Sequence, residues 1–176
     1  MISGIFEMPI TDESYPFSSA ERYCHLSVKD YVEREYRVYG TANVYRTADE
    51  DGGVEVMTAD APYSNRIVVR APKDPAQASG NVVVEIINPT SFMEIERMWI
   101  LGHGEFVRSG DIYVGITSKP NTIAKLKEFN PDRYAFMSGQ TQLPSGPLTL
   151  IRNSSYAAAR FPTWTSPTRL ACFGIC

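Results

Sequence analysis

Residues 80–120 read GNVVVEIINPTSFMEIERMWILGHGEFVRSGDIYVGITSKP, and this stretch decides the fold class. It contains two apolar, β-branched runs, 81–87 and 111–117, of the kind that forms strands covered on both faces. Between them, residues 92–108 carry apolar side chains at helical spacing. A strand, a helix and a second strand with short links predict a βαβ unit, in which the two strands are parallel.

Capping signals mark the ends of the predicted helix. Ser91 is a suitable N-cap, and Glu94 follows three residues later, as in a capping box. Gly110 is a fitting C-terminal stop. A second, shorter helix is predicted over 122–129, before the Asn130-Pro131 pair.

Three further strands are predicted before residue 80. Residues 33–39 alternate polar and apolar side chains, residues 54–58 follow a turn signal, and residues 65–70 end before Pro72. Alternating strands are typical of antiparallel pairing. The predicted fold is therefore α/β, with antiparallel entry strands followed by the βαβ unit on one sheet.

Length and composition describe one ordinary globular domain. The 176 residues are 43% hydrophobic and 21% charged. The sequence contains no run of 18 apolar residues, so it predicts no membrane-spanning helix. Its net charge of −3 does not indicate the basic surface that nucleic-acid binding requires. Three cysteines make no disulfide framework, and the N-terminus lacks a basic segment of the kind that begins a signal peptide. We therefore expect a cytoplasmic protein without nucleic-acid or membrane partners.

The charges divide the chain unevenly. All 20 acidic residues lie within residues 1–132, and residues 133–176 carry four arginines and no lysine. The first part is thus net −7 (13 basic minus 20 acidic groups) and the remainder net +4. Folded domains normally mix both signs on their surface. Residues 139–176 are accordingly predicted to be an irregular tail, with one candidate strand at 148–152.

An ordered series of motifs carries a resemblance to a known family: GTANVY (40–45), PYSNRIVVRAPKDP (62–75), GNVVVEIINPTS (80–91), RSGDIYVGITSKP (108–120) and NPDRYAFMS (130–138). Over residues 28–138 the chain resembles the N-terminal part of the α/β-hydrolase-domain family. The resemblance implies a mostly parallel sheet, a Ser, acid and His triad, a small-molecule ester-type substrate and no cofactor. It divides the chain into an N-terminal extension (1–27), a partial hydrolase domain (28–138) and the tail (139–176).

The catalytic parts that this resemblance implies are missing from the sequence. No G-x-S-x-G elbow occurs, no carboxylate follows Asp132, and no histidine follows His103. A serine without an adjacent base is a weak nucleophile. We therefore predict no catalytic, cofactor-binding or metal-binding residues in this chain.

One family feature that the sequence can supply is half of an oxyanion hole. In this fold, one backbone N–H of that hole comes from the loop that follows the third strand. By resemblance this loop contains Asn88, Pro89, Thr90 and Ser91, and proline has no N–H to donate. Asn88, Thr90 or Ser91 is therefore the candidate donor. The alternative is an ordinary loop in which Ser91 only caps the helix.

The other chemically interesting residues have simpler structural explanations. His103 lies between two glycines, but within the predicted helix and not directly after a strand. The side chains of the neighbours Cys24 and His25 diverge in most backbone conformations. Cys172 and Cys176 alone are too few ligands for a zinc site.

These observations favour the hypothesis that the chain is part of a serine α/β-hydrolase. With the sequence given, we expect it to be inactive, because the nucleophile elbow, the acid and the histidine are absent. The alternative is a small non-catalytic binding or interaction module, completed by a strand from the tail. Because strands 81–87 and 111–117 have the character of central strands, a sheet that stops here would leave them with an uncovered edge. We expect such an edge to promote self-association or aggregation.

Overall fold

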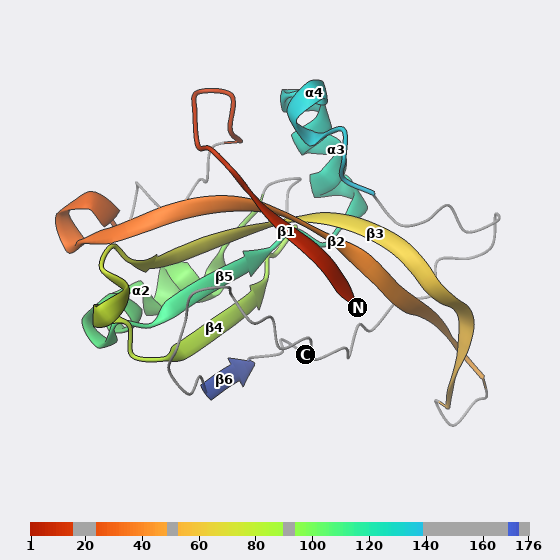
Figure 1. Cartoon of the computed structure of the whole chain (residues 1–176), viewed down its shortest axis with the longest axis horizontal. Helices are drawn as coiled ribbons and strands as arrows, with labels where there is room; N and C mark the ends of the chain where they lie inside the picture. Colours follow the sequence, from red (N-terminus) through yellow and green to blue (C-terminus); the bar gives the residue numbers. More distant parts are fainter. Residues whose placement is uncertain (16–23, 49–52, 90–93, 139–168, 173–176) are drawn as a thin grey trace.

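The computed structural model describes residues 1–15, 24–48, 53–89, 94–138 and 169–172. Its centre is a six-stranded sheet with the order β1-β2-β3-β5-β4-β6 (Figure 1). β2 pairs antiparallel with both β1 and β3. β4 pairs in parallel with both β5 and β6. The predicted α/β fold, with antiparallel entry strands and a βαβ unit, is confirmed.

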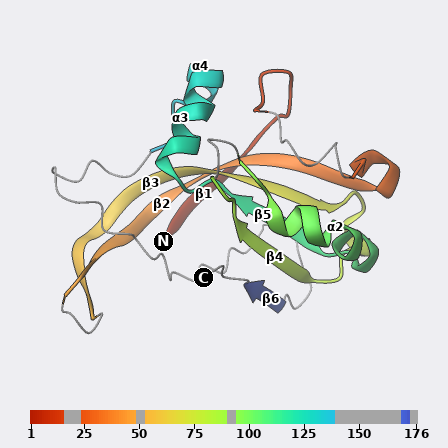
Figure 2. The same cartoon turned by 180° about the vertical axis from the view of Figure 1, so that it is seen from behind.

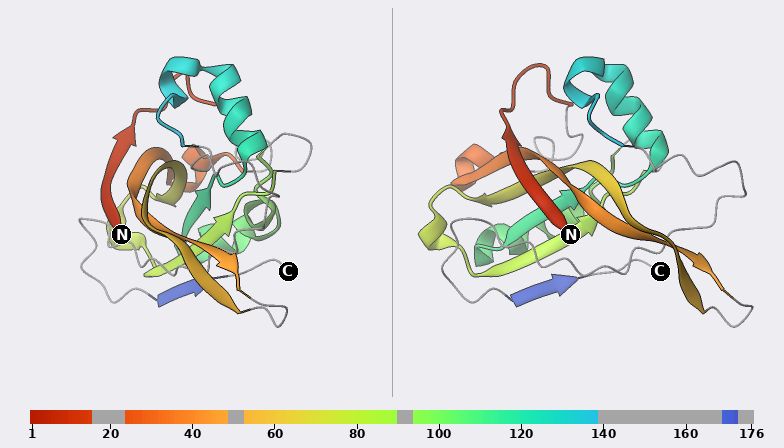
Figure 3. Two further views of the ribbon diagram at one scale, coloured as in Figure 1. Left: turned by 90° about the vertical axis from the view of Figure 1, so that its right-hand side faces the viewer. Right: turned by 45° about the vertical axis from the view of Figure 1, so that its right-hand side comes forward.

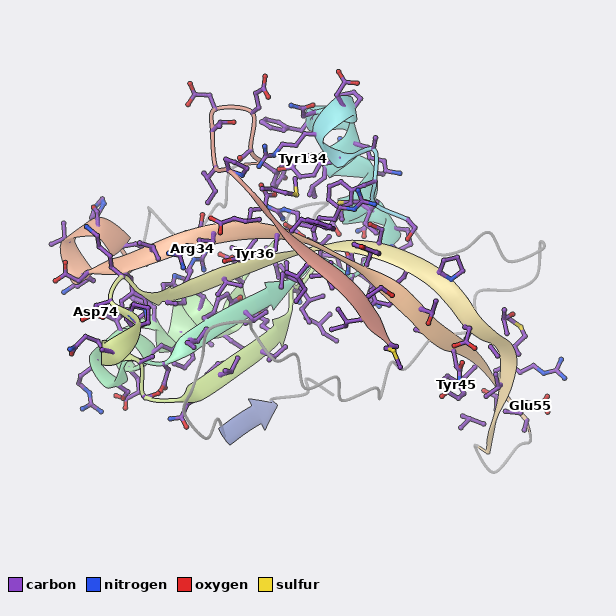
Figure 4. All side chains as sticks on the ribbon, viewed as in Figure 1. Arg34, Tyr36, Tyr45, Glu55, Asp74 and Tyr134 are labelled. Atoms are coloured by element: carbon purple, nitrogen blue, oxygen red, sulfur yellow. The ribbon has the colours of Figure 1, made fainter. Side chains whose placement is uncertain are left out.

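The entry strands are longer than their sequence pattern predicts. β2 (Tyr31–Thr47) and β3 (Val54–Pro72) form a long antiparallel pair, so the two strands predicted at 54–58 and 65–70 are one strand. Pairing continues through irregularities between Ala42 and Tyr45. Beyond the sheet this pair forms a projecting two-stranded arm, on which Figure 4 labels Tyr45 and Glu55.

An additional strand lies before the predicted ones. β1 (Ile2–Met8) pairs with β2 and forms one rim of the sheet. These residues belong to the predicted N-terminal extension (1–27), which lies before the stretch that carries the family resemblance and for which no strand is predicted. The domain division at residue 27 stays a prediction.

The βαβ unit occupies the predicted stretch. β4 (Asn81–Ile86) and β5 (Ile112–Ile116) are parallel, and α2 (Arg97–Ser109) connects them on one face of the sheet (Figure 2). β5 also pairs with β3 and so joins the unit to the entry strands. Short 3-10 turns, η1 (Leu26–Lys29) and η2 (Pro75–Gln77), flank the strands. Two further helices follow β5: α3 (Pro120–Phe129) and α4 (Pro131–Tyr134).

The tail contributes one strand, β6 (Arg169–Cys172), which pairs in parallel with β4. β4 therefore lies between β5 and β6, and β5 lies between β3 and β4. The expectation that these two strands present an uncovered edge is wrong, because each has a neighbour on both sides. The candidate strand at 148–152 falls outside the described residues.

The two faces of the sheet bury different side chains. One face carries an aliphatic cluster whose members include Val38, Ile67, Val69, Val82 and Val114. The other face packs against α2 through Trp99, which is fully buried and lies 5.2 Å from Tyr113 between ring centroids. This second face also holds buried charged residues, which position the candidate site. No helix among the described residues has the length and apolar character that crossing a bilayer requires.

Two glycines of the α2 region provide a test of its C-terminal cap. Gly110 has a φ of 76°, and a Cβ there would lie 2.3 Å from the carbonyl oxygen of Gln77. We expect Gly110→Ala to lower the free energy of unfolding by about 1–3 kcal/mol in urea titrations. Gly104 is an exposed helical residue with open space around it. The control Gly104→Ala should raise stability by up to about 1 kcal/mol, and an equal loss in both variants would contradict this explanation.

Candidate functional site

The loop between β4 and α2 is closed at its base by a pair of backbone hydrogen bonds. The N–H of Asn88 donates to the carbonyl oxygen of Ile95 at 3.1 Å, and the N–H of Ile95 donates back at 2.9 Å. The side chain of Asn121 on α3 donates to the carbonyl oxygen of Pro89 at 3.2 Å. The loop is thus held from both sides at the carboxyl edge of β4.

These bonds bear on the three predicted oxyanion donors. The backbone N–H of Asn88 is used within the base of the loop, and Pro89 has none to offer. Thr90 and Ser91 fall outside the described residues and stay the candidates for the donor.

The predicted capping box is wrong. α2 begins at Arg97, with Glu96 as N-cap residue and no side-chain cap, so the helix does not start at the predicted position and Glu94 is not its third residue. Residues 94–96 instead precede the helix, with Ile95 in an isolated bridge to Asn88, and the side chains of Glu94 and Glu96 are both buried. The physical reason is that these two carboxylates meet buried arginines of β3, and pairing a buried charge outweighs one helix cap.

Arg66 forms the first of these clusters. Its guanidinium donates to Glu94 at 2.5 Å and also pairs with Glu35 of β2, and all three side chains are almost completely buried. Thr117, at the end of β5, donates its hydroxyl to Glu94. Glu94 therefore connects the base of the loop to both β3 and β5.

Glu35 is shared with α4. Arg133 donates to Glu35 at 2.5 Å, and the hydroxyl of Tyr134, labelled in Figure 4, donates to it at 3.0 Å. Burial alone would raise the pKa of Glu35, but Arg66 and Arg133 outweigh burial. The pKa of this carboxyl group consequently lies below its ordinary value, and Glu35 is a carboxylate in the folded protein.

Arg70 forms the second cluster, four residues further along β3. It donates to both carboxylate oxygens of Glu96, at 2.8 and 2.9 Å, and to Glu33 of β2 at 2.7 Å. Its guanidinium carbon lies 4.5 Å from the centre of the Trp99 ring, a cation–π contact. The start of α2 is thereby fixed to the sheet by both an ion pair and an aromatic contact.

A further buried carboxylate, Glu85 of β4, accepts hydrogen bonds at the start of α2. The Tyr113 hydroxyl donates to it at 2.6 Å, and the N–H of Met98 lies 3.1 Å from each of its oxygens. Burial is the largest influence on Glu85 and raises the pKa of its carboxyl group.

Chemically, this arrangement is a rigid support for a loop. The carboxylates of Glu33, Glu35, Glu94 and Glu96 are each bound to an arginine, so all four take part in ion pairs that hold the loop. A backbone loop held at the carboxyl edge of parallel strands can present N–H groups to a ligand.

The histidines and cysteines do not converge on this loop in the described residues. His103 lies within α2, as predicted, and its Nδ1 is 3.1 Å from the carbonyl oxygen of Trp99. Cys24 is buried in the core, whereas its neighbour His25 is exposed, so the two side chains diverge as predicted. Among the residues that the structure describes, no three His, Cys, Asp or Glu side chains gather as a metal site requires. Cys176 is outside them, and Cys172 belongs to β6.

The charged residues that hold the loop are not among the residues predicted from the sequence. A signal for them does exist: Arg66 and Arg70 lie on one face of β3 and are separated only by the apolar residues 67–69, and Glu33 and Glu35 share one face of β2. Charged residues at alternating positions of a buried strand indicate buried ion pairs, because burying them unpaired is too costly.

The depressed pKa of Glu35 leads to a prediction about pH. We expect Glu35→Gln to lower the free energy of unfolding at pH 7 by about 3 kcal/mol, because the buried Arg66 then loses one of the two negative charges that pair with it. The stability due to the Glu35 carboxylate is present above its unfolded pKa of about 4.3 and is lost as pH falls through the lower folded value. The wild-type and variant curves, measured by urea unfolding, should therefore converge below pH 4.3 or so.

Glu105→Gln is the matched control for this substitution. Glu105 pairs with Arg108 on the surface of α2, and both side chains are more than half exposed. Its unfolding curve should stay close to that of the wild type at every pH. A constant difference between wild type and Glu35→Gln across the acid range would contradict the assigned pKa.

Comparison with known proteins agrees with this geometry. Residues 6–158 match the model of a family described as alpha/beta hydrolase domain, and the match extends beyond 28–138 at both ends. A search of curated proteins and a search of solved structures each gave no match. The matched range covers most of the 176 residues and includes the βαβ unit and the loop after β4. The chain therefore belongs to the alpha/beta hydrolase domain family.

Proposed function

We propose that this chain is the oxyanion-side part of a serine hydrolase for carboxylic esters, and that it does not catalyse acyl transfer by itself. In the family reaction, a serine hydroxyl attacks the ester carbonyl while a histidine accepts its proton, and water later releases the acyl group. The observation that carries the proposal is the firmly held loop at the carboxyl edge of β4, in a family whose oxyanion hole uses that loop.

The sheet order indicates where the attacking serine would have to come from. The two N–H donors of an oxyanion hole must lie close together, so the strand before the nucleophile has to end beside β4 at the same edge. β5 occupies one side of β4, which leaves the side where β6 lies. β6 is parallel to β4, but residues 173–176 after it read FGIC and contain no serine.

The remaining triad members are also absent from the sequence. The family order is serine, acid, histidine, and no carboxylate follows Asp132 and no histidine follows His103. Within the described residues, Glu94 and Glu96 at the base of the loop are both bound to arginines. The low number of cysteines supports a cytoplasmic setting for the protein.

A fluorophosphonate probe tests this proposal. We expect no labelling of the purified 176-residue chain, and no hydrolysis of p-nitrophenyl acetate above the rate in buffer. An active serine esterase under the same conditions is the positive control. Labelling or turnover that disappears when one serine is replaced by alanine would show that the chain contains its own nucleophile.

The pairing of β6 with β4 favours a second candidate, a non-catalytic binding module whose tail completes the sheet. Limited trypsin digestion separates the two. Resistance at Arg152 and Arg160, together with absent labelling, supports the module. Rapid cleavage at those arginines, with the rest of the chain still folded by circular dichroism, supports the hydrolase part.

A further inference from the structure

β1 lies at the rim of the sheet, and its outer edge is available for pairing. It contacts β2 along one side, and no described strand lies along its other side (Figure 3). The backbone N–H and C=O groups on that side form a template for another strand. Natural edge strands normally carry protection against such pairing, such as lysine, proline or a bulge.

β1 has little of this protection. Ile2–Met8 contains no lysine and no proline, and Glu7 is its single charged residue. The one irregularity of register falls between Ile2 and Gly4, so Gly4–Met8 is a regular strand. At the middle of this regular part, Phe6 is 56% exposed, so a large apolar side chain is available for contact at the rim of the sheet.

We propose that β1 pairs antiparallel with β1 of a second copy of this chain, about a two-fold axis at Phe6. Two identical strands that pair antiparallel are related by a two-fold axis, so the association closes as a dimer and does not continue into a fibre. The axis falls at Phe6 because this residue is the midpoint of the regular segment that ends before Pro9.

This register gives each exposed group of β1 a suitable neighbour. Phe6 lies opposite Phe6 of the partner subunit, and cross-strand aromatic pairs are favourable. Each Phe6 is already stacked on Tyr39, at 5.6 Å between ring centroids, so four rings would form one cluster on this face. Glu7 lies opposite Ile5 of the partner subunit, which avoids placing two carboxylates directly across from each other.

Sedimentation equilibrium of the full chain tests the dimer. We expect the wild type to reach twice the 19.7 kDa of one chain, and Phe6→Glu to be monomeric. Two carboxylates would then face each other across the axis, whereas within one subunit the new carboxylate lies opposite Arg37. The matched control is Val54→Glu on the arm, where Val54 is 69% exposed, and it should remain dimeric. A monomeric wild type, or a dimer in folded Phe6→Glu, overturns the proposal.

Oxidative crosslinking tests the register and does not depend on the Phe6→Glu variant. Residues directly opposite in an antiparallel pair have Cα atoms about 4.5–5.5 Å apart, which a disulfide can bridge. Phe6→Cys should therefore give a covalent dimer above the wild-type background. The two Glu7 positions are offset by two residues, about 7–8 Å, so Glu7→Cys should not crosslink. Equal crosslinking of both variants, or of neither, overturns the register and with it the two-fold pairing.

Discussion

Two arginines without solvent exposure, Arg66 and Arg70, are the constraint on which the rest of this structure depends. An ion that leaves water for a protein interior loses several kcal/mol of hydration unless it finds partners of opposite charge. Each arginine here has one glutamate from β2 and one from the segment before α2. The same two side chains therefore fix both the pairing of the entry strands and the path of the chain after β4.

That path explains why the loop after β4 is the candidate site. The segment 94–96 would form a first helical turn if local preference decided, but its two carboxylates turn towards the sheet and its middle residue pairs with Asn88. The loop is consequently held at its base, at the edge where parallel strands end and where open α/β sheets generally bind ligands. Under the proposed function, a donor loop that is fixed in advance would need no reorganisation during the reaction.

The parts of the fold that follow from local periodicity were predictable. The runs at 81–87 and 111–117 and the helix between them appear where the pattern places them, because β-branched apolar residues suit a doubly covered strand. Three features depend on distant partners and were missed: β1, which exists through β2; the start of α2, which Arg70 sets; and the uninterrupted β3, which β2 holds together. The sequence could identify the loop, and its pattern could indicate buried charges on β3, but it could not assign the partners of Arg66 and Arg70, since these lie about 30 residues away.

A double-mutant cycle on Arg70 and Glu96 measures the central interaction directly. The variants Arg70→Met, Glu96→Gln and their combination keep the side-chain volumes similar, and urea unfolding gives the free energy of each. We predict a coupling energy of about 2 kcal/mol or more, because both side chains are buried and one guanidinium nitrogen of Arg70 lies within hydrogen-bond distance of both carboxylate oxygens of Glu96. A coupling within about 0.5 kcal/mol of zero would contradict the account, since the segment before α2 would then be held without this pair.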